Sequence, residues 1–201
     1  MRNYSLLCLG DSYTIGEALP ITQSFPYQTI KLLRESGHSF CAPEIIAKTG
    51  WTTDELQSAL EAHKLLEKYD FVTLLVGVNN QYRGREFIEF KQQYENLLTQ
   101  AIKLTGNHKR RLILITIPDY SKTPFAVNAN QEKIAHEIEV YNSLVKALAT
   151  QYHVQVLELA ALPSSAVEEA KLVAADKLHP SEHQYRIWAE HLTKLITREL
   201  S

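Results

Sequence analysis

Short apolar runs alternate along the chain with longer segments of helical period, and this alternation limits the possible folds more than any other feature. Five runs predict β-strands, at residues 5–9, 44–47, 71–76, 111–117 and 154–159. Near-continuous apolar runs are typical of parallel strands that helices cover on both faces. The pattern therefore predicts an α/β fold built on a parallel sheet of about five strands.

The segments between these strands carry apolar residues three and four positions apart, which is the period of an amphipathic helix. They predict helices at residues 25–36, 53–68, 87–104, 131–151 and 181–200. In the last segment Tyr185, Trp188 and Leu192 fall on one face, as expected of a helix that covers a sheet. Ser181 follows Pro180 and is a candidate N-cap for this helix.

The length of the chain fits one domain, because single hydrophobic cores stop growing only near about 250 to 300 residues. Only 7 Gly and 7 Pro are present among 201 residues, which leaves little room for a flexible linker. We therefore expect a single domain over residues 1–201. The net charge of −2 and the lack of long basic runs argue against a nucleic-acid partner.

The sequence also indicates where in the cell the protein is located. The apolar stretch 6–9 is too short for the core of a secretory signal, and no run approaches the 18 or so apolar residues of a membrane span. Two cysteines, Cys8 and Cys41, do not make a disulfide framework, and we expect Cys8 to be a buried free thiol. We expect a cytoplasmic protein with no membrane span.

Polar clusters follow the ends of three predicted strands, where open α/β sheets bind their ligands. They are 10–16 (beginning Gly-Asp-Ser), 48–53 (beginning Lys-Thr-Gly) and 77–81 (beginning Gly-Val-Asn). A fourth cluster, Asp-Lys-Leu-His-Pro at 176–180, opens the last helix. The sequence therefore predicts a site at one edge of the sheet.

These clusters contain the groups that ester hydrolysis requires: a hydroxyl nucleophile, a base, an orienting acid and donors for the oxyanion. Ser12 is the candidate nucleophile, His179 the base, and Asp176 the acid that reaches the second imidazole nitrogen across a turn. The backbone N–H groups of Ser12 and Gly50 and the side-chain amide of Asn79 would then bind the oxyanion. We expect no cofactor and no metal ion.

In these four blocks the sequence resembles the SGNH hydrolase superfamily, also called GDSL esterases and lipases, which is named for its Ser, Gly, Asn and His. Ser12, Gly50, Asn79 and His179 match the four blocks in order, with Asp176 in the Asp-x-x-His of the last. The resemblance implies a three-layer α/β/α sandwich of flavodoxin-like topology. It also implies a serine esterase acting on a small-molecule ester.

Two positions depart from the family pattern. Asn80 stands where the third block usually carries Asp, and Tyr13 stands where the name carries Leu. Beside the catalytic candidates, Asp11, Trp51, Asn80 and Tyr82 are candidate substrate-binding residues, and the loop after residue 117 is a candidate wall of the pocket. The absence of a long apolar lid favours a short, acetyl-type acyl group on a soluble substrate.

Alternatives remain at this level. The same family includes lysophospholipases and thioesterases, and a ligand-binding member without catalysis would keep the same strand ends. A nucleotide-binding α/β protein is disfavoured, because no glycine-rich phosphate loop follows the first strand. His179 and His183 are four residues apart but have no acidic third ligand, which disfavours a metal site.

Overall fold

A computed structural model of the chain describes residues 2–159 and 172–201, and its centre is a five-stranded sheet. The strands are β1 (Leu6–Gly10), β2 (Glu44–Ala47), β3 (Phe71–Leu75), β4 (Leu112–Ile115) and β5 (Gln155–Leu157). All four strand pairings are parallel, and the strand order is β2-β1-β3-β4-β5. The α/β class and the parallel sheet predicted from the apolar runs are confirmed.

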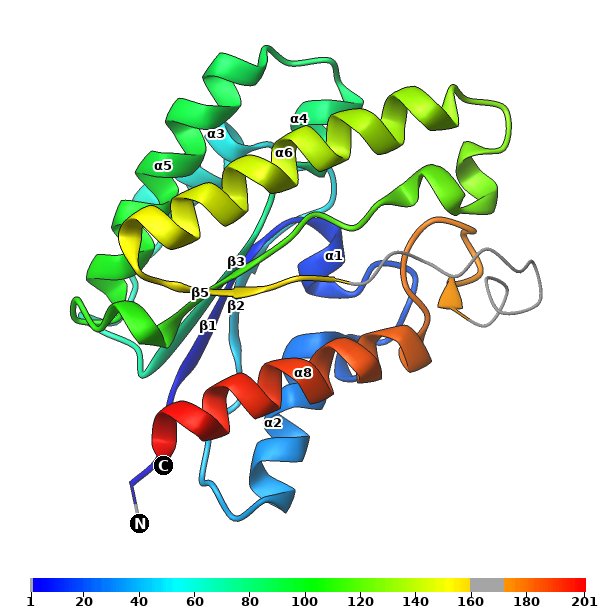
Figure 1. The fold of residues 1–201 in the computed structure, drawn as a ribbon. Coiled ribbons are helices and arrows are strands. Elements are labelled where there is room, and N and C mark those ends of the chain that lie inside the picture. The colour runs from blue at the N-terminus through cyan, green and yellow to red at the C-terminus, as the bar shows by residue number, and fades with distance from the viewer. Residues whose placement is uncertain (1, 160–171) are drawn as a thin grey trace.

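Helices cover both faces of the sheet and make the three layers (Figure 1). On one face α2 (Phe25–Glu35) packs against α8 (Glu182–Leu200). On the other face α5 (Phe87–Leu104) packs against both α3 (Thr53–Ala62) and α6 (Gln131–Tyr152). The five helices that the sequence predicts are therefore present, and the apolar stripe of α8 contains the buried residues Tyr185, Trp188 and Leu192.

Several short elements join this framework and were not predicted, because they are shorter than the window in which a helical period can be recognised. Two short helices follow central strands directly: α1 (Ser12–Ile15) follows β1, and α4 (Val78–Tyr82) follows β3. Short 3₁₀ turns occur at η1 (Ile21–Gln23), η2 (Lys109–Arg111), η3 (Tyr120–Lys122) and η4 (Pro124–Ala126). Both short helices begin at the edge of the sheet where the polar clusters were expected.

Some predicted boundaries are wrong. The helix expected to reach residue 68 ends at Ala62, because Tyr69 must turn into the core ahead of β3. The Tyr69 hydroxyl donates to Glu44 Oε2 at 2.7 Å, and its backbone N–H donates to Leu104 O at 2.7 Å. The strands at 111–117 and 154–159 are also shorter than predicted, and Arg111 belongs to η2.

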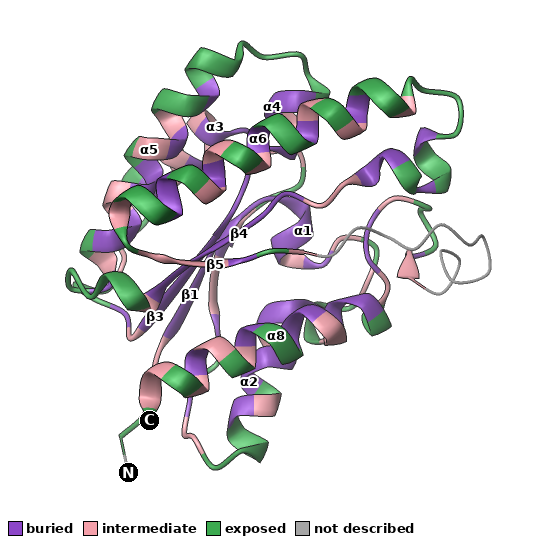
Figure 2. Cartoon of the chain, in the orientation of Figure 1, coloured by how far each residue is buried: buried purple, intermediate pink, exposed green. Residues whose placement is uncertain are grey.

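The central strands form the most deeply buried part of the molecule (Figure 2). Every residue of β1 and β3 is buried, which explains why both read as continuous apolar runs. Burial raises the pKa of the Cys8 thiol to about 12, so Cys8 stays an inert thiol within the core. No helix in the described ranges combines the length and the apolar character that crossing a bilayer requires.

Candidate active site

Ser12 is presented at the end of the central strand β1. It is the first residue of α1, and Asp11 caps this helix by accepting a hydrogen bond from Tyr13 N at 3.0 Å. The backbone N–H of a residue in the first helical turn has no acceptor within the helix, so no carbonyl of α1 competes with a ligand for that of Ser12. Gly10 permits the close approach of the ends of β1 and β3 before α1, since a Cβ there would lie 2.4 Å from Leu75 O.

His179 approaches Ser12 from the segment that precedes α8. Its Nε2 atom lies 2.9 Å from Ser12 Oγ, although the two residues are 167 positions apart in the chain. Its Nδ1 atom donates to Asp176 Oδ2 at 2.6 Å. The structure thus brings the three residues of the predicted triad together in one chain of hydrogen bonds.

Asp176 is held by the turn that carries His179. Its Oδ1 atom accepts hydrogen bonds from the backbone N–H groups of Leu178 and His179, each at 3.0 Å, and Lys177 adopts a left-handed φ of 65°. Partial burial tends to raise the pKa of Asp176, but the bonds from the imidazole and the two N–H groups together bring it below its ordinary value. Asp176 is therefore ionised at neutral pH and can orient the imidazole.

Gly50 and Asn79 lie across from Ser12 on the two flanking strand ends. Gly50 follows β2 in a turn with φ of +83°, a conformation that favours glycine. Asn79 lies in α4 and donates from Nδ2 to Trp51 O at 3.0 Å. An amide nitrogen carries two hydrogens, so Asn79 retains one donor for a ligand.

A cavity of about 170 Å³ opens beside these groups. Its wall is made by Ser12, Tyr13, Thr49, Gly50, Val78, Asn79, Tyr82, Tyr120, Phe125, Leu178 and His179. No Asp, Glu, Lys or Arg of the described chain belongs to this wall. Tyr82, Tyr120 and Phe125 form an aromatic group at one side, with ring centroids 6.2–6.4 Å apart. The cavity therefore suits an uncharged, apolar group.

The four candidate substrate-binding residues lie in different surroundings. Tyr82 lines the cavity and is 60% exposed. Asp11 and Asn80 are each only 1% exposed and do not belong to the cavity wall, and Trp51 packs against the core instead. Asn80 bonds to Thr53, accepting from its backbone N–H at 3.1 Å and donating to its Oγ1 at 2.8 Å.

Other wall residues were not singled out from the sequence. Tyr13 and Leu178 each adjoin a residue of the predicted triad, so their position next to a motif was the available signal. Tyr120 and Phe125 belong to the loop after residue 117, which was predicted to shape the pocket. No periodicity marks individual loop residues, so only the segment could be predicted.

Comparisons with known proteins identify the family to which the chain is similar. The sequence profile of the GDSL-like Lipase/Acylhydrolase family matches residues 8–187. No curated protein sequence matches the chain.

Similar solved structures share the fold at low identity. A lipase from a goat rumen metagenome has a TM-score of 0.73 at 20% identity, covering 96% of this chain and 97% of its own. The acetylxylan esterase Axe2 from Geobacillus stearothermophilus has a TM-score of 0.69 at 20% identity, with 98% and 94% covered. The psychrotrophic esterase EstA from Pseudoalteromonas sp. has a TM-score of 0.68 at 14% identity, with 98% and 99% covered.

The family profile spans all four polar clusters, from Ser12 to the segment that carries Asp176 and His179. The fold of the similar structures extends over nearly the whole chain. The chain therefore belongs to the GDSL-like lipase/acylhydrolase family of ester-hydrolysing enzymes.

Proposed function

We propose that this protein is a serine esterase in which Ser12 is the nucleophile, His179 the general base and Asp176 the group that orients the imidazole. The observation that carries the proposal is the hydrogen-bonded chain from Asp176 through His179 to Ser12 at the wall of an apolar cavity. A hydroxyl becomes a good nucleophile when an oriented base accepts its proton in this way.

The reaction would proceed by acylation and deacylation. Ser12 Oγ attacks the ester carbonyl while its proton passes to His179 Nε2, and the imidazolium then protonates the departing alcohol. The N–H groups of Ser12 and Gly50 and the Asn79 amide would bind the oxyanion that forms on the carbonyl. Water then attacks the acyl-enzyme by the same route and regenerates the Ser12 hydroxyl.

The cavity supports a short, uncharged acyl group of the acetyl type on a small soluble ester. Its volume of about 170 Å³ is modest, and no Asp, Glu, Lys or Arg of the described chain reaches its wall. The acetylxylan esterase of similar fold agrees with this preference. The exposed rings of Tyr82 and Phe125, 60% and 46% accessible, favour a second candidate in which a longer acyl chain extends along them, as in a lysophospholipase or thioesterase.

Hydrolysis of p-nitrophenyl esters from acetate to octanoate, by wild type and Ser12→Ala, tests the proposal. We expect wild type to favour the short esters and Ser12→Ala to lose turnover by at least about 10⁴-fold, since the nucleophile is removed. Ser143→Ala, an exposed serine on α6, is the matched control and should remain active.

A near-normal rate in Ser12→Ala would contradict the assignment of the nucleophile. The EstA esterase of similar fold from Pseudoalteromonas sp. is inhibited by monoethylphosphonate, so phosphonate labelling provides a second readout. A wild type that neither hydrolyses the series nor becomes labelled at Ser12 by a fluorophosphonate would favour the ligand-binding alternative. Best activity on octanoate would favour the long-chain candidate.

A further inference from the structure

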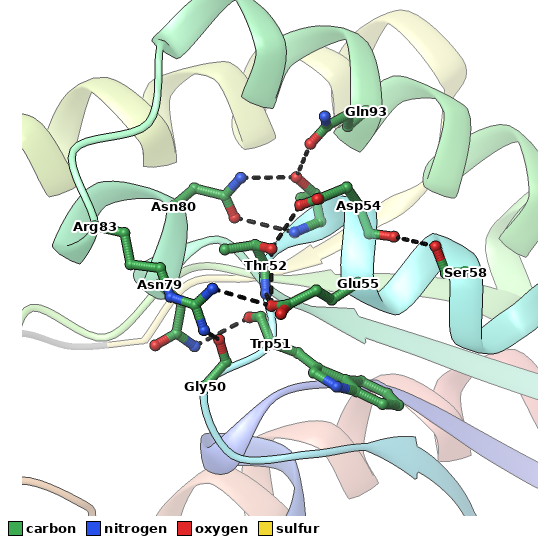
Figure 3. A network of polar contacts seen from close by, with 11 residues as sticks. Gly50, Trp51, Thr52, Asp54, Glu55, Ser58, Asn79, Asn80, Arg83 and Gln93 are labelled. Atoms are coloured by element: carbon green, nitrogen blue, oxygen red, sulfur yellow. Dashed lines mark hydrogen bonds and ion pairs between the residues drawn. The ribbon is translucent and has the colours of Figure 1, made fainter.

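The loop that carries Gly50 is fastened to α4 by three side chains (Figure 3). Asn79 donates to Trp51 O, and Asn80 bonds to the backbone N–H and hydroxyl of Thr53. Arg83, the C-cap residue that follows α4, is the third. Residues of α4 and its C-cap therefore hold the segment from Gly50 to Thr53 at three points.

The guanidinium of Arg83 joins two parts of this segment. Its Nη2 donates to the carbonyl oxygen of Gly50 at 2.5 Å, and its Nη1 lies 3.3 Å from Glu55 Oε2. Glu55 is itself fixed, because its carboxylate accepts from Thr52 N at 2.9 Å in the capping box of α3. Arg83 thus links the glycine turn to the first turn of a helix.

The Glu55 carboxylate, which pairs with Arg83, is ionised at neutral pH. The backbone N–H of Thr52 lowers the pKa of Glu55, outweighing its desolvation, and Arg83 lowers it further. The planar guanidinium presents several donors in a fixed fork, so it can hold a carbonyl and a carboxylate together. An ammonium group is a single point of charge and cannot reproduce this geometry equally well.

Gly50 needs such a restraint. At φ of +83° it occupies a region that glycine enters and leaves readily, and glycine loses more freedom on ordering than other residues. Within the turn the backbone N–H of Trp51 donates to Lys48 O at 3.2 Å. The bonds from Arg83 and Asn79 hold two further carbonyls of this segment, those of Gly50 and Trp51.

We propose that Arg83 is a positioning residue rather than a cation that binds substrate. By holding the Gly50 carbonyl it fixes the Gly50–Trp51 peptide, and through the Gly50 backbone it orients the Gly50 N–H of the oxyanion hole. The proposal rests on the proposed function, since it assigns the Gly50 N–H to the developing oxyanion. Arg83 does not belong to the cavity wall, so its effect on the reaction passes through Gly50.

The test compares Arg83→Met with Arg85→Met on p-nitrophenyl acetate. A misplacement of about 1 Å in a catalytic group costs about 100-fold, and a loosened turn should cost less, so we expect kcat to fall by about 10-fold in Arg83→Met. KM should change by less than about twofold, because a transition-state interaction is lost. Arg83→Lys should recover part of kcat. Among the described residues, the Arg85 side chain makes no hydrogen bond or ion pair to the Gly50 segment, and it lines a separate pocket with Lys133, so Arg85→Met should match wild type.

A trifluoromethyl ketone provides a readout that loss of stability alone would not change. Ser12 Oγ adds to its carbonyl with transfer of the proton to His179, and the resulting oxyanion needs the same donors. Its inhibition constant should rise in Arg83→Met by the same factor as kcat falls. Thermal unfolding of each variant confirms that the protein stays folded during the assay.

The results separate two failures. Unchanged kcat in a folded Arg83→Met, while Ser12→Ala is inactive, overturns the positioning role and leaves the proposed function intact. A rise in KM confined to anionic esters also overturns it, because Arg83 would then bind substrate. Full activity in Ser12→Ala would instead show that the proposed function itself is wrong.

Discussion

Asp11 stands beside Ser12 in the sequence but faces away from the cavity. Its Oδ1 caps α1, while its Oδ2 is buried without a hydrogen-bond partner among the described residues. Burial raises its pKa from 3.8 to about 7, although the N–H of Tyr13 acts in the opposite direction. When burial raises the pKa of a carboxyl above its value in the unfolded chain, the protonated form favours the folded state. Ionisation of the group then lowers the free energy of unfolding.

Asp11 should therefore lower stability as pH rises from about 4 to about 7. In that range the unfolded chain has lost the proton while the folded protein retains it, so the free energy of unfolding falls with pH. The change from 3.8 to about 7 corresponds to at most about 4 kcal/mol. Urea unfolding at several pH values should show this slope in wild type relative to Asp11→Asn, which keeps the cap acceptor. Parallel pH profiles of the two proteins would contradict it.

The Asn79 side chain donates one hydrogen bond to the described residues and keeps one amide hydrogen for the proposed oxyanion hole. Asn79→Ala should lower kcat/KM for p-nitrophenyl acetate by about 100- to 1000-fold, or about 2.7–4 kcal/mol, as loss of one oxyanion donor does elsewhere. The reduction should fall on kcat rather than on KM. An unchanged kcat in a folded variant would remove Asn79 from the proposed hole.

The sequence predicts the polar residues of the site better than it predicts the residues that surround them. Ser12, Gly50, Asn79 and His179 each follow a strand or precede a helix in a short motif, so chain position alone indicated their shared edge. Asp11 and Asn80 lie in the same motifs but point into the protein. Only the backbone geometry of α1 and α4 decides which side chains of a motif face the cavity.

At the scale of elements, α4 and α3 are joined through Asn80, and this contact bears on the departure from the family pattern. Asn80→Ala would leave the Thr53 N–H unpaired at the buried start of α3, at a cost of about 1–3 kcal/mol. Asp would accept from both Thr53 groups, and its charge would be favourable at a helix N-terminus. Gln93 would then have to rotate its amide and donate to the Thr53 hydroxyl.

We therefore expect Asn80→Asp to lower the free energy of unfolding by less than about 1 kcal/mol, well below the cost of Asn80→Ala. Urea denaturation of both variants at pH 7 is the measurement. Equal losses in the two would show that the amide donor, rather than the acceptor, holds the two helices together.

The long helices could be predicted from their period, whereas the joints between elements could not. The start of α8 is marked by Ser181, whose hydroxyl accepts from Gln184 N as an N-cap. The early end of α3 depends on Tyr69, whose partners Glu44 and Leu104 are distant in sequence. Tertiary contacts of this kind override helix propensity, and a local sequence pattern cannot predict them.

At the scale of the whole molecule, the site exists only when both helical layers are in place. Ser12 extends from the centre of the sheet, whereas His179 is fixed by its own turn and by the docking of α8. The Tyr185 hydroxyl donates to Tyr13 O at 2.9 Å and ties α8 to α1. Gly50 and Asn79 instead depend on the contact between α4 and α3. The proposed hole and the proposed triad are thus supported from opposite sides of the sheet.

If residues 1–201 form one cooperative domain, activity and structure should disappear together in urea. The two tryptophans report on the two sides, Trp51 beside α3 and Trp188 on α8. We expect esterase activity, tryptophan fluorescence and far-UV circular dichroism to share one midpoint. Tyr185→Phe should move all three midpoints down together, because Tyr13 O loses its buried donor at a cost of about 1–3 kcal/mol. Activity that disappears at lower urea than the circular dichroism signal would show instead that α8 undocks as a separate unit.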